Sequence, residues 1–556
     1  MKQVLSTIIR QSITKAITTG EFPIPPSQVP DIIIEIPKDK SFGDYACNVA
    51  MQLARPTRLS PRRIAEIIVT HSAEHPYMAK CEIAGPGFIN FTIADAAYHD
   101  KLREVFVQQE QYGASNVGKK HKVMVEFVSA NPTGPLHIGH GRGAAVGDTL
   151  ARLLAFAGYD VTREYYINDA GNQMNNLGRS TYIRYMQLLG HESFQLDENC
   201  YQGDYIIGIA RDVVAKYGPK FEHDDAALPF FTKLTGDIIL QGIIDDLKTF
   251  EVTFDTYFSE KSLHEGGHVA RVLDQLLETK GAYEEDGALW VKTTNYTDDK
   301  DRVVRRSNGE TTYFAADIAY HKNKLDREFT TIIDIWGADH HGYVGRMNAA
   351  MQLLGAPENT LEVILIQLVN LLRDGKPVAM STRSGEFDAL IDVLNEVGTD
   401  AARYFFLMRR SDSQLDFDLE LAKKQTNENP VFYVQYSHAR CCSIVEQLKA
   451  NQQYPALPLE NISLAAVTSP QERELIKTLV KFPEVVAGAA LAREGHRIPH
   501  YLNELASNFH SFYNTCRVIG AETDELTAAR TTLVEATRQV VANGLHLLGV
   551  SAPQKM

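Results

Sequence analysis

Two histidines spaced three residues apart are the side chains in this sequence that best suit phosphate chemistry. His137 and His140 frame the tetrapeptide HIGH, which follows a Pro/Gly turn and opens a predicted helix. A helix start carries unpaired N–H groups and partial positive charge, so it stabilises an anion. Both imidazoles lie on one face of the first turn and can donate to a nucleotide phosphate. Gly139 and Gly141 would let a ribose or base approach the backbone closely.

A second group of residues could neutralise charge on a transferring phosphate. The loop at 371–387 reads LLRDGKPVAMSTRSGEF, and its Asp-Gly pair is a turn signal. It offers Lys376, Ser381 and Arg383 to a transferring phosphate and its leaving pyrophosphate. Alone the loop would be read as a solvated hairpin, but its predicted place beside the nucleotide favours the chemical role.

Acidic side chains form a third group. Tyr313 and Asp317 lie four residues apart, and hence on one helical face, in an otherwise apolar stretch. Asp317 is either a structural partner of a nearby base or a receptor for a cationic ligand. Because paired carboxylates bind a guanidinium at two points, Glu126, on the strand before HIGH, is a natural second contributor.

A metal site is not expected. Asp339, His340 and His341 are adjacent, but their segment holds no Cys and no helical His-x-x-x-His spacing, so polar contacts to a ribose or amino acid are favoured. The six cysteines include no Cys-x-x-Cys pair and no zinc spacing. They are typical of reduced thiols in a cytosolic protein.

The elements that must position these groups are strands and helices of a parallel sheet. Patterning predicts strand 123–128, helix 139–157 and strand 161–167, which is a βαβ unit, and later strands at 330–337 and 362–369. Ligands of such α/β sheets gather at the carboxyl ends of the strands. We therefore expect the HIGH turn and the segments that follow the other strands to face one crevice.

The 556 residues exceed what one core supports. A compact N-terminal α/β module is expected before a Gly-rich linker, and residues beyond about 395 are predicted to be wholly helical. The expected domains are 1–110, a catalytic region 120–390 with an insertion at about 178–300, a connecting helical segment 391–430, and a helical bundle 431–556.

Composition limits the possible partners. A formal net charge of -14 argues against a basic surface that coats nucleic acid, whereas residues 431–556 hold eleven Lys/Arg and eleven Asp/Glu and can approach a polyanion. The N-terminal helix is interrupted by Lys2, Arg10 and Lys15 and is not a signal peptide. No apolar run reaches the roughly 18 residues of a membrane span. We expect a cytoplasmic protein without membrane contact.

Several longer segments carry a resemblance to a known family. The segments ANPTGPLHIGH, TYFAADIAYHK, WGADHHGYV and YVQYSHAR occur in this order, so the chain resembles the class I aminoacyl-tRNA synthetases and, more narrowly, the bacterial-type arginyl-tRNA synthetases. The resemblance covers nearly the whole chain. It implies a Rossmann-type catalytic domain, an N-terminal α/β additional domain that contacts tRNA, and a C-terminal all-helical anticodon-binding domain.

The resemblance implies an ATP-dependent ligation. The carboxylate of L-arginine attacks the α-phosphate of ATP, and the terminal ribose of tRNA(Arg) then takes the arginyl group. Such chemistry depends on positioning and charge stabilisation more than on a general acid or base. Mg2+ is expected with ATP, held by phosphates and water, with no zinc, and the enzyme is expected to be a monomer.

The resemblance also implies residue roles. Arginine would be held by one set: Glu126, Ser129, Asn131, Tyr313 and Asp317. ATP would be contacted by another, in which the roles of Asp339 and His340 are left open: His137, Gly139, His140, Gly141, Asp339, His340 and Met380. Catalysis would rest on four residues: His137, His140, Ser381 and Arg383.

The chain departs from the family pattern in the segment that carries the second signature of the family. Where the KMSKS signature has two lysines, residues 379–383 read AMSTR. We hypothesise that Arg383, Lys376 or Arg142 supplies the missing charge. Two alternatives stay open at this point, a synthetase-like tRNA-binding protein that has lost adenylation and a class I synthetase for another amino acid.

Overall fold

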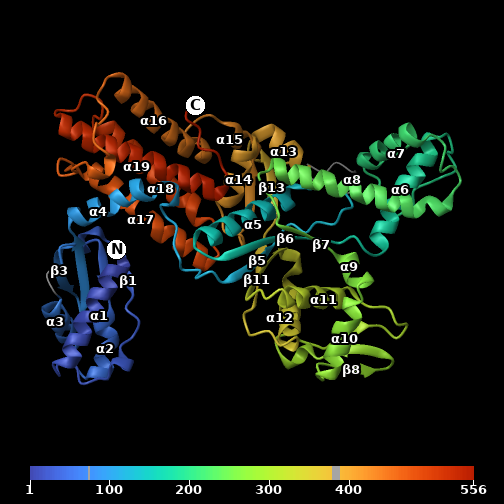
Figure 1. Cartoon of the computed structure of the whole chain (residues 1–556), viewed down its shortest axis with the longest axis horizontal. Helices are drawn as coiled ribbons and strands as arrows, with labels where there is room; N and C mark the ends of the chain where they lie inside the picture. The colour runs from blue at the N-terminus through green and yellow to red at the C-terminus, as the bar shows by residue number, and fades with distance from the viewer. Residues whose placement is uncertain (73–74, 379–388) are drawn as a thin grey trace. The chain divides into compact units, whose positions relative to one another are not determined.

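The computed structural model describes residues 1–72, 75–378 and 389–556, and its contacts form two compact units (Figure 1). The first unit comprises Met1–Gln109, Val445–Val480 and Ser511–Ala536. The second comprises Glu110–Ile444, Lys481–His510 and Thr537–Met556.

The first unit contains the predicted N-terminal α/β module. Its antiparallel sheet has the spatial order β1 (Ile34–Glu35), β2 (Tyr45–Cys47), β4 (Phe88–Ile93) and β3 (Met78–Ala84). The helices are α1 (Lys2–Thr18), α2 (Val49–Thr57), α3 (Pro61–His71) and α4 (Asp95–Gln108). Helix α1 buries Leu5, Ile9 and Ile13 on the predicted apolar stripe and packs on α3.

The second unit is built on a five-stranded parallel sheet. The spatial order is β12 (Leu361–Ile366), β11 (Thr331–Gly337), β5 (Lys122–Glu126), β6 (Asp160–Ile167) and β7 (Thr256–Ser259). Val123, Met124 and Val125 have no exposed surface, as expected for a strand covered on both faces. The prediction of a Rossmann-type α/β domain is therefore confirmed.

The order of the strands shows where a ligand should bind. Helix α5 (Ile138–Phe156) connects β5 to β6, and β7 continues on that side before the chain returns to β11 and β12 on the other side of β5. The topological switch point therefore lies between β5 and β11. A crevice forms there, beyond the carboxyl ends of the strands, in sheets of this kind.

Long insertions separate β6 from β7 and β7 from β11 in the chain. Helices α6 (Asn172–Leu188), α7 (Asp204–Tyr217) and α8 (Leu228–Thr249) lie between β6 and β7. Between β7 and β11 come α9 (Glu260–Glu265), α10 (His268–Glu278), the antiparallel strands β8 (Ala282–Glu285), β9 (Ala288–Val291) and β10 (Arg302–Arg305), and α11 (Tyr313–Asp326). The expected insertion at 178–300 is thus interrupted by β7, a strand too short to give a periodic signal.

The segment after β12 differs from its predicted structure. After α12 (Val344–Leu353) and β12 the chain forms β13 (Val369–Arg373), β14 (Lys376–Pro377), α13 (Leu390–Val397), α14 (Thr399–Leu407), β15 (Leu415–Asp418) and α15 (Leu419–Lys423). The prediction that residues beyond 395 are wholly helical is wrong at β15. Leu415 and Phe417 alternate with acidic residues, are buried, and pair in parallel with β13.

The remaining chain is helical, as predicted. Helices α16 (Pro430–Ala450), α17 (Pro470–Ala492), α18 (Arg497–Thr515) and α19 (Asp524–Leu548) each contribute residues to both units. Among the helices described here, none combines the length and apolar character that crossing a membrane requires.

Candidate active site

Three neighbouring strands place carboxylates side by side in the second unit. Asp334 of β11 is in register with Glu126 of β5, which is in register with Glu164 of β6. All three side chains are buried. A row of buried like charges is unfavourable unless cations compensate it.

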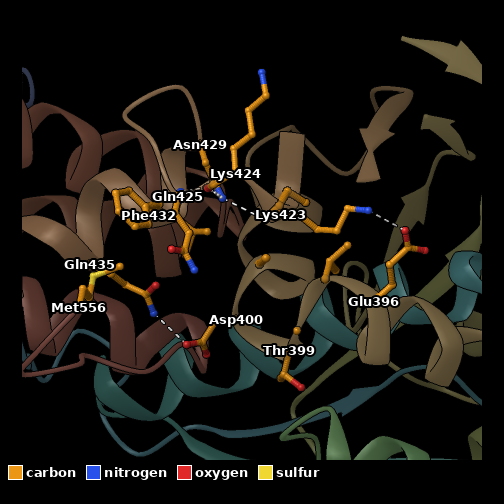
Figure 2. A pocket seen from close by; sticks show the side chains of 15 residues that line it. Glu396, Thr399, Asp400, Lys423, Lys424, Gln425, Asn429, Phe432, Gln435 and Met556 are labelled. Atoms are coloured by element: carbon orange, nitrogen blue, oxygen red, sulfur yellow. Dashed lines mark hydrogen bonds and ion pairs between the residues drawn. The ribbon is translucent and has the colours of Figure 1, made fainter. Parts of the chain in front are cut away.

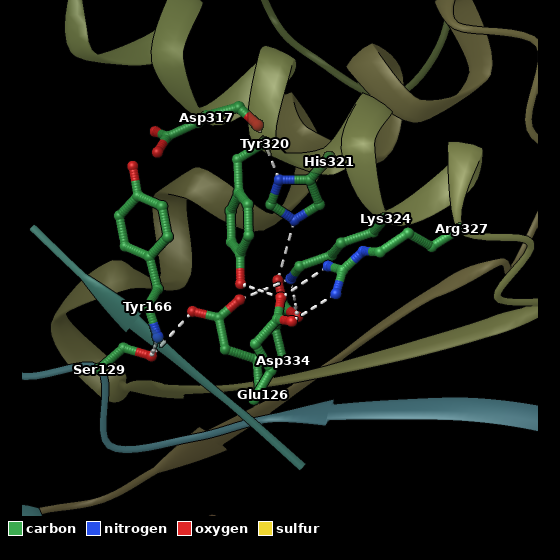
Figure 3. A network of polar contacts seen from close by, with 10 residues as sticks. Glu126, Ser129, Tyr166, Asp317, Tyr320, His321, Lys324, Arg327 and Asp334 are labelled. Carbon is green, nitrogen blue, oxygen red and sulfur yellow. Dashed lines mark hydrogen bonds and ion pairs between the residues drawn. The ribbon is translucent and has the colours of Figure 1, made fainter. Parts of the chain in front are cut away.

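Helix α11 and the residue that follows it supply those cations (Figure 3). Lys324 Nζ lies 2.5 Å from Glu126 Oε2 and 2.8 Å from Asp334 Oδ1, and Arg327 donates to both carboxylate oxygens of Glu164 at 2.6 and 2.8 Å. Burial alone would lower the pKa of Lys324, but the two carboxylates outweigh it and raise that pKa. Although burial favours protonation of Asp334, Lys324 and His321 lower its pKa to about 2.

His321 also contacts the row of carboxylates. Its Nε2 lies 2.9 Å from Asp334 Oδ2 and its Nδ1 2.8 Å from the carbonyl oxygen of Asp317. These contacts fix the orientation of the imidazole between α11 and β11. Lys324 is the cation that compensates Glu126 and Asp334.

Glu126 is therefore less available than the sequence suggested. Its second oxygen, Oε1, accepts from Ser129 Oγ at 2.9 Å, and Ser129 Oγ in turn accepts from the backbone N–H of Tyr166. Burial raises the pKa of Glu126 even beside Lys324. Each oxygen of Glu126 thus has one donor that fixes its orientation, and an ionised carboxylate keeps acceptor positions for a further donor.

Asp317 and Glu260 are the carboxylates that lack a strong cationic partner. Asp317 accepts from the Tyr343 hydroxyl, and Glu260 lies 3.6 Å from His264. Among the described residues, neither pairs with a lysine or arginine. Burial raises the pKa of each, and the charge of Asp317 adds to the effect on Glu260.

A tyrosine hydroxyl lies beside this acidic pair. Tyr166 OH is buried and makes no hydrogen bond of normal geometry within the described part of the chain. Burial and the charges of Glu260 and Asp317 raise the pKa of Tyr166 far above its usual value. Figure 3 shows its ring directed toward Asp317. The arrangement can accept a cation that also offers hydrogen bonds.

The HIGH turn forms a closed cap at the start of α5. The backbone N–H of Gly139 donates to His137 Nδ1 at 3.1 Å, and that of His137 donates to His140 Nδ1 at 3.3 Å. The two rings stack with centroids 3.7 Å apart. Burial lowers the pKa of His137, and burial together with His137 lowers the pKa of His140 to about 3. Both rings are therefore neutral, with the proton on Nε2.

The turn between β5 and HIGH is held in an uncommon conformation. Val128 and Ser129 have φ values of 67° and 40°, which are rare for residues other than glycine. The hydroxyl of Tyr165 donates to the Ala130 carbonyl at 2.8 Å, and that of Tyr205, from α7, donates to the Thr133 carbonyl at 2.7 Å. Two tyrosines thus fix the path of the chain into the HIGH turn.

Gly141 and Arg142, which follow HIGH on α5, have roles in packing this helix against its neighbours. A Cβ on Gly141 would lie 2.6 Å from Leu390 Cδ1, so a larger residue at this position would force Leu390 of α13 to move. Arg142 is fully buried and donates to the carbonyls of Gln367 and Arg410, each at 2.8 Å. These bonds tie α5 to neighbouring loops and favour Lys376 or Arg383 over Arg142 as the substitute for a KMSKS lysine.

The chain that follows the loop at 371–387 lies beside the HIGH turn. Ala389 forms an isolated bridge with His137, and the N–H of Leu390 donates to the Leu136 carbonyl at 2.8 Å. Lys376 is exposed in β14. The predicted residues Met380, Ser381 and Arg383 lie outside the described residues.

Four other predicted residues lie in exposed positions. Tyr313 is 77% exposed at the first residue of α11, and Asn131 is exposed in the turn before HIGH. Asp339 and His340 follow β11, with 3.6 Å between Asp339 Oδ2 and His340 Nε2. Within the described chain none of them donates to Glu126 or Asp317, so the structure does not join them to the buried carboxylates.

A cavity of about 680 Å³ lies elsewhere in the second unit (Figure 2). None of the predicted site residues lines it. Its charged groups are already paired: Lys423 lies 3.0 Å from Glu396, and Gln435 donates to Asp400 at 2.8 Å. This cavity therefore offers little unmet charge to a nucleotide.

Sequence reasoning missed Glu260, Tyr166 and Lys324. A carboxylate inside a strand otherwise expected to be buried, as at Asp334, was an available signal that a buried cation must follow. No comparable signal marked Glu260, because β7 and α9 are only four and six residues long.

Known proteins match this chain along its whole length. Residues 3–93 match the family described as arginyl tRNA synthetase N terminal domain, residues 101–440 the tRNA synthetases class I (R) catalytic domain, and residues 434–556 the DALR anticodon binding domain. The chain is 52% identical to an arginine-tRNA ligase of Citrifermentans bemidjiense and 51% to one of Desulfosudis oleivorans, each over 100% of both chains. A structure titled as a putative arginyl-tRNA synthetase from Campylobacter jejuni superposes with a TM-score of 0.77 and 36% identity, covering 83% of this chain and 100% of that one.

Proposed function

The chain belongs to the arginyl-tRNA synthetase family and acts as an arginine-tRNA ligase, and on that premise we propose how its residues hold each substrate. ATP, L-arginine and tRNA are the substrates of this activity. Full-length identity to arginine-tRNA ligases favours it over the two alternatives, a synthetase for another amino acid and a protein without adenylation.

The guanidinium of arginine binds between Asp317 and Glu260. The observation that supports this assignment is that neither Glu260, which is buried, nor Asp317, which is half-buried, pairs with a lysine or arginine in the described chain. Burial accordingly raises the pKa of both carboxylates. A guanidinium supplies the missing positive charge and forms charge-assisted hydrogen bonds. A neutral side chain would leave both carboxylates buried and unpaired, which costs several kcal/mol and excludes it.

Glu126, Ser129 and Asn131 orient the α-ammonium group, and Tyr313 lies at the rim of the amino-acid site. Lys324 and Ser129 hold the Glu126 carboxylate in one orientation at the carboxyl end of β5. A fixed carboxylate at the topological switch point suits the ammonium better than the larger guanidinium. This assignment divides the five predicted residues between the two ends of the substrate.

ATP lies over the HIGH turn. The Nε2–H groups of His137 and His140 donate to its phosphates, with Gly139 beneath them, and Asp339 and His340 border the nucleotide. Met380, Ser381 and Arg383 contribute to binding ATP and to stabilising the leaving pyrophosphate. Ala389, which follows them in the chain, bridges His137. Neutral imidazoles act here as donors and not as proton carriers.

The reaction follows from these positions. An arginine carboxylate oxygen attacks the α-phosphorus of ATP and pyrophosphate leaves. A hydroxyl of the terminal tRNA ribose then attacks the carbonyl of the adenylate and AMP leaves. Mg2+ accompanies ATP, held by phosphates and water, and no zinc takes part.

The larger organisation rests on the resemblance. We propose a cytoplasmic monomer in which residues 1–110 contact tRNA, 120–390 catalyse, 391–430 connect, and 431–556 read the anticodon. Single-stranded anticodon bases stack on aromatic side chains, which the helices of the last region supply.

Arginine-dependent kinetics test the carboxylate pair. Asp317→Asn and Glu260→Gln should each raise the arginine KM by about 100-fold or more, as expected when one partner of a buried charge pair is lost. The ATP KM should change little. The control is Glu265→Gln, an exposed residue of the same helix as Glu260. Unchanged arginine affinity in both site variants would contradict the assignment.

A further inference from the structure

Three metal-ligating side chains meet in the second unit, outside the proposed active site. They are His191, Glu222 and His223, and their ligand atoms all lie within 4.8 Å of one another. His191 Nε2 is 2.5 Å from Glu222 Oε1, and the rings of His191 and His223 have centroids 4.5 Å apart. The proposed function assigns no role to any of them.

Two turns carry these ligands, and both lie in the helical insertion formed by α6, α7 and α8 between β6 and β7. His191 follows α6, whereas Glu222 and His223 follow α7, about thirty residues later in the chain. Each turn is tied to α6 by a side chain. The hydroxyl of Tyr185 donates to the Gly218 carbonyl at 2.7 Å and accepts from the N–H of Phe221 at 3.1 Å.

The second tie comes from a residue two positions further along the same helix. Gln187 Nε2 donates to the Phe194 carbonyl at 2.7 Å, which fixes the turn that carries His191. Phe194 and Phe221 pack on the buried cluster around Tyr185 and Phe231. The insertion therefore holds the three ligands together without a metal ion.

The donor set selects a class of ion. Two imidazole nitrogens and one carboxylate oxygen suit Zn2+ and related transition metals, whereas Mg2+ and Ca2+ prefer all-oxygen sites. Glu192 and Asp224 are exposed next to the ligands in sequence and add negative charge. His223 also has a φ of 53°, so the turn holds this ligand in a backbone conformation that few residues adopt.

We propose that His191, Glu222 and His223 bind one divalent transition-metal ion of the Zn2+ class, which cross-links the two turns at the end of the insertion. Water completes the coordination. The ion stabilises the insertion and takes no part in ligation. The site departs from the expectation that the chain carries no protein-held metal. That expectation relied on local spacing, which cannot join ligands from two separate turns.

Metal titration of the full-length, metal-free protein tests the proposal. Isothermal titration with Zn2+ should show one site per chain, and Co2+ should give visible absorption bands of nitrogen and oxygen ligation. His191→Ala and His223→Ala should each weaken Zn2+ affinity more than about tenfold, which corresponds to about 1.4 kcal/mol. The control His121→Ala removes an exposed histidine outside the cluster and should bind like the wild type.

A second measurement separates binding at this site from binding elsewhere. Because a ligand that binds only the folded state stabilises it, Zn2+ should raise the Tm of the wild type but not of the double variant His191→Ala/His223→Ala. Arginylation by this variant should remain near wild type, which shows that it is folded. Equal Zn2+ affinity in the wild type and the double variant, or Co2+ bands typical of thiolate ligation, would overturn the proposal.

Discussion

Lys324 Nζ lies 2.5 Å from Glu126 Oε2, and the same ammonium reaches Asp334 on the neighbouring strand. One buried cation thus joins two strands on either side of the topological switch point. Because Glu126 is also proposed to orient the amino acid, the ion pair couples the fold of the sheet to the substrate site.

Replacing this lysine should destabilise the enzyme strongly. Lys324→Met keeps a similar length but leaves Glu126 and Asp334 buried without their cation, and losing one partner of a buried pair costs about 3–5 kcal/mol. We expect a lower Tm and a raised arginine KM in the fraction that remains folded. Thermal unfolding and steady-state kinetics measure the two effects.

A lysine on the same helix provides the control. Lys322 pairs with Asp326 at the surface of α11, and such exposed pairs contribute at most about 1 kcal/mol. Lys322→Met should therefore leave both Tm and KM almost unchanged. If the two variants were equally stable, the charge balance described for Glu126 would be wrong.

The neutral state of His140 predicts a pH dependence of stability. Its pKa is about 3 in the folded protein, below the 6.5 of an unperturbed histidine. Between these values the unfolded chain binds a proton that the folded chain does not, so the free energy of unfolding falls as pH falls from about 6.5 toward about 3. One full proton contributes about 1.4 kcal/mol per pH unit.

His140→Asn tests this dependence. The amide oxygen can still accept from the His137 N–H, but the side chain no longer titrates. The Tm should therefore drop less between about pH 7 and about pH 5 in the variant than in the wild type. A drop of equal size in both proteins would mean that His140 is not held neutral.

The sequence predicted the parts of the fold that have strong periodic signals. Strands β5, β6 and β11 and helix α5 lie within a few residues of their expected positions, because buried parallel strands and an amphipathic crossover helix are unambiguous. Strands β7 and β15 were missed, since a four-residue strand depends on its partner and not on its own pattern.

The site was predictable only in its local features. The HIGH turn combines strand, turn and helix start within one segment, so its residues could be placed together. By contrast, the partners of Glu126 depend on long-range pairing, since Lys324 lies 198 positions later. The charge of Asp317 acts on Glu260 only because the fold brings the segment after β7 near α11.

The insertion is predicted to support catalysis through Tyr205. Its hydroxyl donates to the Thr133 carbonyl in the turn before HIGH. Tyr205→Phe leaves that carbonyl without its partner at a cost of about 1–3 kcal/mol, so we expect adenylation to slow by about 5- to 100-fold. Tyr201→Phe, whose hydroxyl makes no hydrogen bond in the described chain, should slow it little. Equal rates in the two variants would contradict a positioning role for α7.

The segment AMSTR at residues 379–383 lacks both lysines of the KMSKS pattern, so another cation must stabilise the transferring phosphate. We expect Arg383→Ala to reduce single-turnover formation of arginyl-adenylate by about 10- to 1,000-fold, the effect of removing a cation that stabilises the transition state. Lys376→Ala should have a smaller effect if it shares this charge.

A variant of Arg142 separates the effect of losing a positive charge near the ATP phosphates from the effect of disturbing the packing around α5. Arg142→Lys keeps the charge but cannot reach both carbonyls that the guanidinium holds, so it should lower Tm while the folded enzyme forms adenylate at a rate near wild type. The measurement is single-turnover adenylation with tRNA present, alongside thermal unfolding. Wild-type rates in both Arg383→Ala and Lys376→Ala would show that neither residue replaces the missing lysines, and the neutral donors of the HIGH turn would then stabilise the leaving pyrophosphate without help from the loop.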